Sequence, residues 1–367
     1  MLSRAKIFSG FARCSRPPRF AVRNMSEKSK DSAIKFQVGG KKETYTAVDV
    51  QAEANKFYNF FKTLKGQKIV GGLWVAGSVI GLLYQLAPHW FFLEQVKQIY
   101  QSYTNGLPTK VKDEMMDLIR EVTVDMKLTE EELNCIDVFV LTMTEPFAWG
   151  DLSRLGLVGF PQFYYFQELE DVPLAKMRFG TVHDSGSNTA LTQTQLESEA
   201  AKSFCTSMLL SDDAKKFSIA REIERLKFQP FIVHGSMSFC FILLTYNVSR
   251  IINRKLELFK KPPMVRGIAY LSILPSMILA YVIGKDAFNR NIDTELDKRA
   301  SMIGSNYAAG GVEYYEKVMQ RNRALRELEG ERGQQKYTGK GEFMDGVIRF
   351  RQANLHDRKE VCKAHCK

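Results

Sequence analysis

The sequence predicts an α+β membrane protein with three transmembrane helices and a composite soluble domain. Although 25% of its residues are charged, three stretches contain no Asp, Glu, Lys or Arg, namely 69–93, 228–249 and 267–284. A transmembrane helix needs about 17–25 mostly apolar residues to cross a hydrocarbon core about 30 Å thick. Each stretch reaches that length, and the segments between and after them show helical or strand periodicity.

Each of these stretches has one alternative interpretation, a buried helix in a soluble core. Asn247 weakens the second stretch and Pro275 the third. A membrane helix tolerates proline because neighbouring groups can satisfy the carbonyl that it frees. In the first stretch, Gly77 and Gly81 form a G-x-x-x-G pattern. This pattern predicts close helix packing, with glycines that face lipid by chance as the alternative.

The first 26 residues have the composition of a mitochondrial presequence. Residues 1–26 contain six Lys or Arg residues, four serines and no acidic residue. They lack an apolar segment of the length that a secretory signal needs, and an Arg-rich, acid-poor start is typical of mitochondrial targeting. The alternative is a basic tail on the cytosolic side of another membrane. Residues 27–68 are predicted to be a polar linker and a matrix segment.

The charges of the loops predict the orientation in the membrane. The loop 250–266 contains six basic residues and one acidic residue, and residues 1–68 contain fifteen basic and five acidic residues. Residues 91–228 reverse this balance, with fourteen basic and twenty-two acidic residues. The positive-inside rule places the first two segments on one side, and 91–228 and 285–367 on the other. The net charge of +11 is therefore a topology signal, and no interleaved aromatic and basic motif indicates nucleic-acid binding.

The segment between the first two spans, 94–227, is predicted to contain helices and strands. Apolar residues recur at helical spacing in 94–126, and Thr129 followed by Glu132 predicts a capping box at a helix start. Two runs rich in β-branched and aromatic residues predict strands. These runs are 136–143 and 155–166, the second broken near Gly159 and Pro161.

The remaining soluble elements are predicted from helix caps and breakers. Ser211, followed by two aspartates, predicts the start of a helix over 212–226. After the third span, 293–328 is predicted to be helical with an interruption at Gly310 and Gly311. The soluble domain is expected to combine two separate segments, 94–227 and 285–367.

Several runs of the chain resemble the transmembrane protein 177 family. The most specific is Gly-Gly-Val-Glu-Tyr-Tyr-Glu-Lys at 310–317, and shorter matching runs lie at 156–161, 210–222 and 297–301. The resemblance extends over 69–350, including all three predicted spans. The residues of the specific run that we single out are Gly310, Gly311, Glu313, Tyr315, Glu316 and Lys317.

This resemblance implies a place in the mitochondrial inner membrane and a role in early maturation of cytochrome c oxidase subunit 2, together with that subunit's membrane chaperone. The 250–266 loop would then face the matrix, and 94–227 and 285–367 would face the intermembrane space. The expected function is non-enzymatic assembly or stabilisation. The expected partners are the bilayer, the subunit and its chaperone, with no nucleic acid and no cofactor.

A more distant pattern resembles membrane-embedded zinc proteases of the HtpX type. In those enzymes a helix with H-E-x-x-H precedes membrane spans, and a later helix carries E-x-D. Here Arg221 and Arg225 occupy both histidine positions around Glu222, and the later helix carries Glu295 and Asp297. Glu222 then matches the general base and Glu295 the carboxylate ligand. The resemblance implies a degenerate gluzincin-like fold without its metal, because arginine stays protonated and cannot ligate zinc.

Two alternatives remain open for this pattern. The first is an ordinary solvated helix face beside a membrane. The second, a working membrane-bound zinc metalloprotease, is disfavoured because no two of the five histidines are four residues apart. Cys362, His365 and Cys366 supply too few ligands for structural zinc, and this tail is predicted to be exposed. We therefore assign no catalytic residue and no metal ligand, and the lack of charged residues inside the spans disfavours a transporter.

Overall fold

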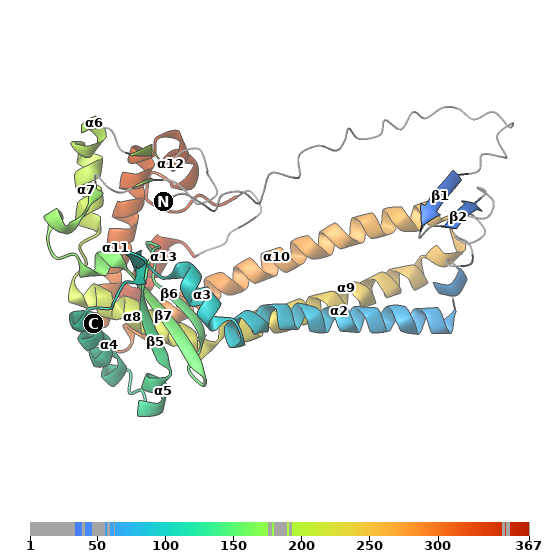
Figure 1. The fold of residues 1–367 in the computed structure, drawn as a ribbon, viewed down its shortest axis with the longest axis horizontal. Coiled ribbons are helices and arrows are strands. Elements are labelled where there is room, and N and C mark those ends of the chain that lie inside the picture. The colour runs from blue at the N-terminus through green and yellow to red at the C-terminus, as the bar shows by residue number, and fades with distance from the viewer. Residues whose placement is uncertain are drawn as a thin grey trace. The chain divides into compact units, whose positions relative to one another are not determined.

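The structure, a computed structural model of the chain, separates into two compact units, residues 1–70 and 71–367. It describes residues 34–38, 41–45, 56, 59–61, 63–174, 178–179, 189–190, 193–346, 349 and 353–366. The predicted presequence, 1–26, lies outside the described residues. Helices and strands carry the labels of Figure 1.

Part of the first unit is an antiparallel hairpin. Strands β1 (Ile34–Val38) and β2 (Lys41–Tyr45) pair with Ile34 opposite Tyr45. This stretch was predicted to be a linker, and the hairpin was not predicted. Its signal is the alternation of apolar and polar residues in β1, which is typical of a strand.

Three long helices confirm the three predicted spans by length and composition. They are α2 (Leu64–Trp90), α9 (Pro230–Lys255) and α10 (Pro263–Ser301), with mean hydropathies of 1.7, 1.5 and 1.8 over their apolar windows. Helix α10 runs unbroken through Pro275 and has 39 residues. At about 1.5 Å per residue it is much longer than a bilayer core. The predicted third span therefore has no helix end at residue 284, and α10 continues into the soluble domain.

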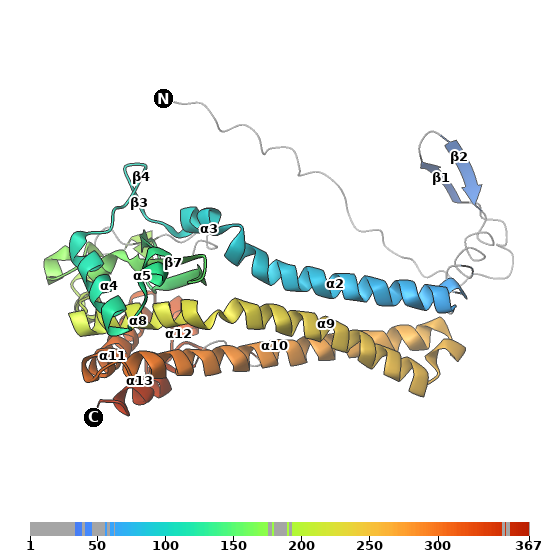
Figure 2. The same ribbon diagram turned by 90° about the horizontal axis from the view of Figure 1, so that it is seen from below.

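Within the second unit, α9 packs against both α2 and α10 (Figure 2). A Cβ on Gly81 of α2 would lie 2.8 Å from Ile242 Cδ1 of α9, so this glycine permits a close approach. At Gly77 a Cβ would meet no atom within 4 Å, so this glycine takes no part in the contact. Ser238 of α9 and Tyr281 of α10 share a hydrogen bond of 2.7 Å between their hydroxyl groups.

The stretch after the first span is not one helix, although 94–126 was predicted to be helical. It forms α3 (Leu93–Tyr100), a hairpin of β3 (Tyr103–Thr104) and β4 (Leu107–Pro108), and α4 (Asp113–Asp125). Asn105 and Gly106 join the two strands with φ values of 54° and 81°. Two successive residues with positive φ are what a tight hairpin turn needs, and Asn-Gly is its usual sequence.

The soluble domain contains a three-stranded sheet with the order β5-β7-β6. Its strands are β5 (Ile136–Leu141), β6 (Phe147–Asp151) and β7 (Leu155–Pro161), and α5 (Glu130–Asn134) before them has the predicted capping box. β5 is parallel to β7, and β6 is antiparallel to it. The predicted strand at 136–143 is thus confirmed as β5, and β6 was not predicted. The predicted strand at 155–166 is confirmed only as far as Pro161, where β7 ends, and it is not broken at Gly159. A Cβ there would lie 2.6 Å from the Leu141 side chain, so this glycine serves strand packing.

Helices on one face of the sheet complete the main core (Figure 1). The larger ones are α4, α7 (Glu199–Ser207), α8 (Asp212–Phe228), α11 (Ser305–Leu328) and α13 (Leu355–Lys363). The short helix α12 (Glu331–Lys336) follows α11. The shorter elements are α6 (Gln193–Leu196), β8 (Arg178–Phe179), β9 (Thr189–Ala190), η1 (Gln162–Tyr165), η2 (Leu169–Asp171) and η4 (Leu258–Lys260). Helix α8 packs against β6 and β7 and is capped by Ser211, whose hydroxyl accepts a 3.2 Å hydrogen bond from Ala214 N. The predicted start of this helix is therefore confirmed.

The predicted interruption at Gly310 and Gly311 is wrong, because α11 runs through both residues. The break falls instead at 302–304, between α10 and α11. A Cβ on Gly310 would lie 2.2 Å from the carbonyl oxygen of Asp213, and one on Gly311 would lie 2.7 Å from Cys362 Sγ. The two glycines therefore permit close contact of α11 with α8 and α13.

The C-terminal residues are not the exposed tail that was predicted. Helix α13 buries Leu355, Arg358 and Cys362 against the domain. Burial raises the pKa of the Cys362 thiol to about 12. Cys366 is exposed beyond the end of the helix. The tail was misjudged because its apolar positions are few, and a charged side chain, Arg358, provides much of the docking.

Candidate functional site: an arginine and carboxylate cluster

The structure brings together four of the five residues that the protease-like pattern singled out. Arg221, Glu222 and Arg225 lie on α8, and Asp297 lies opposite them on α10. Glu295 does not join them. Its carboxylate pairs at 2.9 Å with Arg299, and both side chains are more than two-fifths exposed. The proposed match of Glu295 with a protease's carboxylate ligand is therefore not met by the geometry.

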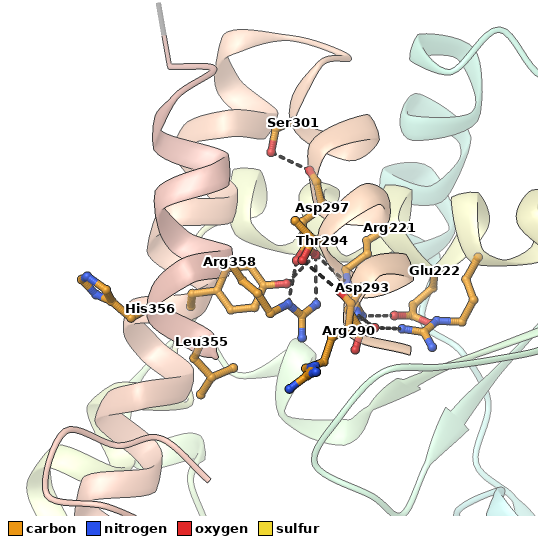
Figure 3. Close-up of polar contacts among 12 residues, drawn as sticks. Arg221, Glu222, Arg290, Asp293, Thr294, Asp297, Ser301, Leu355, His356 and Arg358 are labelled. Carbon is orange, nitrogen blue, oxygen red and sulfur yellow. Dashed lines mark hydrogen bonds and ion pairs between the residues drawn. The ribbon is translucent and has the colours of Figure 1, made fainter. Parts of the chain in front are cut away.

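Asp297 is the centre of the site and is fully buried. Its Oδ1 accepts hydrogen bonds from Arg221 Nε at 2.8 Å and from the Tyr315 hydroxyl at 2.6 Å. Arg358 of α13 donates to both oxygens, from Nε to Oδ2 at 2.6 Å and from Nη2 to Oδ1 at 3.0 Å. Figure 3 shows Arg358 on one side of Asp297 and Arg221 on the other. One carboxylate thus ties α8, α10, α11 and α13 together.

A second group of contacts extends the cluster along α8. Arg221 donates from Nη1 to Glu222 Oε1 at 2.5 Å and from Nη2 to Asp293 Oδ1 at 2.9 Å. Arg225 Nη2 donates to the same Asp293 oxygen at 3.1 Å. Arg225 Nε lies 3.2 Å from Glu222 Oε2, which is close enough for an ion pair. The contact lacks hydrogen-bond alignment, so this buried Nε has no hydrogen-bond partner among the described residues.

The cluster is electrically balanced, with three arginines and three carboxylates. They are Arg221, Arg225, Arg358, Glu222, Asp293 and Asp297. Burial by itself would raise the pKa of Asp293, but Arg358, Arg221 and Arg225 lower it overall. Burial raises the pKa of Tyr315, so its hydroxyl keeps the proton that it donates to Asp297. Buried charges are tolerated when each is paired and hydrogen-bonded, and the cluster meets that condition except at one N–H group.

Helical spacing explains which residues meet. Asp293 and Asp297 are four residues apart on α10 and therefore share one face, whereas Glu295 lies two residues from each and faces away. Sequence reasoning missed Asp293 because the protease pattern directed attention to Glu295. The i, i+4 pair of aspartates was the available signal. Arg358 was not predicted either. It lies outside the family resemblance, and no local sequence signal shows that this arginine reaches Asp297.

A cavity of about 290 Å3 opens beside the cluster. One wall is β6 with the loop before it, and the other walls come from α8, α10, α11, α13 and Phe343. The lining residues are Glu145, Pro146, Phe147, Ala148, Trp149, Arg221, Glu222, Arg225, Asp293, Tyr314, Tyr315, Val318, Phe343, Leu355 and Arg358. Aromatic and apolar side chains therefore surround a floor of paired charges.

The donor set does not suit a metal ion. Guanidinium groups stay protonated and cannot ligate, and the three carboxylates of the cluster are each engaged by arginine. Within the part of the chain that the structure describes, no group of three or more His, Cys, Asp or Glu side chains is placed to hold a metal. The arrangement can hold helices in register and present a cavity lined by both charged and apolar side chains.

The residues of the family run lie on α11 and contact its neighbours. Glu313 accepts hydrogen bonds from Ser211 N at 3.0 Å and Ser211 Oγ at 2.5 Å, which reinforces the cap of α8. Lys317 Nζ donates to the Thr206 carbonyl oxygen at 2.9 Å, and Glu316 lies 3.6 Å from Lys359 of α13. Tyr315 is the member of the run that reaches the cluster. The others attach α11 to its surroundings.

Comparisons with known proteins point to one family. The family model for transmembrane protein 177 matches residues 143–361, which is more than half of the chain. Transmembrane protein 177 of Xenopus laevis is 26% identical over 305 residues, covering 81% of this chain and 94% of that protein. The Homo sapiens protein is 26% identical over 273 residues, covering 74% and 84% respectively. No solved structure matches.

The fold and the site together define a multi-pass membrane protein with an α+β soluble domain built around a buried ionic cluster. The chain belongs to the transmembrane protein 177 family. The matched region includes α8, α10, α11 and most of α13, so every residue of the cluster lies inside it.

Proposed function

We propose that this protein is a non-enzymatic factor of the mitochondrial inner membrane that stabilises newly made cytochrome c oxidase subunit 2, acting with that subunit's membrane chaperone. Family membership and the role that the sequence resemblance implies support the proposal. The acid-free, Arg-rich start supports a mitochondrial location. The basic 250–266 loop supports an orientation with the N-terminus in the matrix and the C-terminus in the intermembrane space.

One observation carries the non-enzymatic part of the proposal. Where the distant protease resemblance expects a general base, Glu222 is only 1% exposed and is engaged by Arg221 and Arg225. A general base must be free to reach the proton that it abstracts. A carboxylate that is paired with two guanidinium groups is suited to a structural role. We therefore favour a binding role, in which the acidic 91–228 segment and the membrane helices contact the client.

The test is clean deletion of the gene, followed by pulse labelling of mitochondrial translation products. Synthesis of subunit 2 should continue, while the new subunit should disappear faster and oxidase activity should fall. Reintroduction of the wild-type chain serves as the control. An unchanged lifetime of the subunit with an unchanged oxidase level would remove this function and leave the membrane architecture.

The second candidate, a membrane-bound zinc metalloprotease, is tested on the purified protein. We expect metal analysis to find no stoichiometric zinc. A Glu222→Gln variant that accumulates to wild-type levels should rescue the deletion. Stoichiometric zinc in the wild-type protein, or a folded Glu222→Gln variant without activity, would revive the enzymatic interpretation.

A further inference from the structure

Strand β6 lies at an edge of the sheet, and its pairing shows which main-chain groups point outward. Gly156 N of β7 donates to the Cys135 carbonyl oxygen at 2.7 Å, so the main chain of Gly156 faces β5. Main-chain groups alternate in direction along a strand, so Val158 also faces β5. Its partner Ala148 then forms a pair without ladder hydrogen bonds. The N–H and C=O groups of Ala148 therefore point away from the sheet, as does the N–H group of Gly150.

Other parts of the chain cover one end of each edge of the sheet. At the β5 edge, Ser102 N donates to the Val140 carbonyl oxygen at 2.7 Å, and Thr142 N donates to the Tyr100 carbonyl oxygen at 3.1 Å. The β5 edge is therefore covered at residues 140–142. At the β6 edge, the end near α2 is occupied. Here Gly150 N donates to His89 Nδ1 at 3.3 Å, and the Trp149 indole donates to the Pro88 carbonyl oxygen at 3.2 Å.

Ala148 is the open position of the β6 edge. Among the described residues, no hydrogen bond from outside the sheet reaches its outward N–H and C=O groups. An unpaired strand edge is a template for another extended chain. The position also lines the cavity of about 290 Å3, together with Pro146 and Phe147. The open edge and the cavity are therefore parts of one surface.

The cavity suits one large side chain that carries no net charge. Its volume is close to the lower limit of about 300 Å3 for pockets that hold whole ligands. The charges on its lining are balanced, three arginines against Glu145, Glu222 and Asp293. Tyr314, Val318 and Phe343 contribute apolar surface on the wall opposite the strand. A large apolar side chain would cover this surface without leaving a charge unpaired.

We infer that β6 binds an extended peptide segment of a partner protein, which pairs with the main chain of Ala148 and places one large apolar side chain in the cavity. Main-chain pairing supplies affinity in this mode of recognition, and the pocket for an alternate side chain supplies selectivity. The inference rests on the proposed function only for the identity of the partner protein, which would be an unassembled client. A folded client would have its strands already paired, so the site favours immature chains.

Hydrogen–deuterium exchange of the full chain in lipid nanodiscs tests the inference directly. The probes are short overlapping synthetic peptides that tile the intermembrane-space part of cytochrome c oxidase subunit 2, with scrambled peptides for comparison. One or more probes should slow exchange across residues 147–149 by about tenfold, the effect of roughly one added backbone hydrogen bond. The covered β5 edge, read at residues 140–142, should not change.

A pair of variants isolates the main-chain contact. Ala148→Pro removes the outward N–H group without removing a hydrogen bond of the fold, and edge strands accept proline. It should weaken peptide binding by about tenfold. Ala148→Ser keeps the N–H group and should bind as the wild type does. Thermal unfolding shows whether each variant is folded. If the proline variant is not folded, the exchange experiment on the wild type decides the question.

The outcomes separate this inference from the proposed function. If no peptide, native or scrambled, protects residues 147–149, the inference is overturned. If the client co-purifies equally with the wild type and with folded Ala148→Pro, the inference is also overturned while the proposed function stands. If peptides protect the edge but deletion leaves subunit 2 unaffected, the peptide site stands and the proposed client is removed.

Discussion

Asp297 receives hydrogen bonds from Arg221 on α8, Tyr315 on α11 and Arg358 on α13. Its side chain is fully buried, so this carboxylate depends on those partners for its charge to be tolerated. The partners come from three helices that are distant in the sequence. At the scale of single residues, the cluster therefore acts mainly as a tertiary lock, a set of contacts that holds α8, α11 and α13 against α10.

Replacing Arg358 should show the strength of this lock. Arg358→Met keeps much of the apolar stem but removes the guanidinium from a fully buried carboxylate. Breaking one partner from a buried pair costs about 3–5 kcal/mol, so the variant should unfold at a clearly lower temperature. Circular dichroism during heating in detergent measures the change.

The matched control is Arg299→Met on the same α10 surface as Glu295. That pair is exposed, with side chains 45% and 42% accessible, and exposed pairs contribute about 0–1 kcal/mol. Its unfolding temperature should stay close to that of the wild type. Equal losses in the two variants would contradict the assignment of the cluster as a lock.

Asp293 predicts how the cluster responds to acid. Burial alone would raise its pKa, but Arg358, Arg221 and Arg225 bring it below the ordinary value of 3.8. Such a carboxyl contributes stability above its unfolded pKa and loses that contribution as pH falls through the folded pKa. Asp293→Asn should therefore be less stable than the wild type at neutral pH, and the difference should shrink below pH 3.8. Denaturant unfolding at a series of pH values measures it, and a difference that persists in acid would refute this account.

At the scale of elements, α11 contacts α8 and α13 closely because it carries glycine where they meet. Cβ positions on Gly310 and Gly311 would overlap Asp213 and Cys362. A glycine pair usually weakens a helix, and here tertiary contact outweighs that local cost. The same close contact and the ion pair of Arg358 with Asp297 dock α13, which has few apolar residues.

A glycine pair of variants tests this packing. Gly310→Ala forces a methyl group against the Asp213 carbonyl and should destabilise the protein by about 1–3 kcal/mol. Gly77→Ala, at a position with no atom within 4 Å, should be neutral or slightly stabilising. Thermal unfolding of both variants in the same detergent decides the matter. Equal tolerance of the two changes would mean that α11 does not approach α8 as described.

The two C-terminal cysteines report whether α13 is docked. Cys362 is buried with its pKa raised to about 12, whereas Cys366 is exposed. Because the thiolate is the reactive form, iodoacetamide should modify Cys366 long before Cys362 at neutral pH. Lys363 places them on separate tryptic peptides, so mass spectrometry can follow each one. Similar rates in folded protein would indicate a free tail.

At the scale of the whole molecule, α10 connects the membrane to the site. Its first part is the third apolar span, and its last turns carry Asp293 and Asp297. The third span and the two aspartates of the cluster therefore lie on one continuous helix of the second unit.

The proposed orientation is tested in mitoplasts, where the outer membrane is open. Added protease should digest 91–228 and the C-terminal segment, because the loop charges predict that both face the intermembrane space. The basic 250–266 loop should stay protected until detergent is added. Peptide-specific antibodies read each segment, with a matrix protein as the integrity control. A protected C-terminal segment would reverse the orientation.

Much of this architecture could be predicted because it depends on local properties. Spans follow from uninterrupted apolar composition, the α8 start from Ser211 and two aspartates, and the α5 capping box from the spacing of Thr129 and Glu132. The failures have two causes. The continuity of α11 and the docking of α13 depend on contacts that outweigh local preference. The hairpin at Asn105 has a local signal, Asn-Gly, that the prediction of one helix overlooked.

The sequence by itself determined the three spans and the family, because the apolar composition of a span and a family motif are both properties of contiguous residues. The tertiary structure alone decided which charges meet. Glu295 and Asp297 are both acidic residues of the same helical segment. Because of the rotation along α10, Glu295 faces solvent and Asp297 faces the core. Arg358 and the open edge at Ala148 belong to the site only because distant segments fold beside each other. Such contacts depend on packing across the whole domain, and no local sequence pattern predicts them.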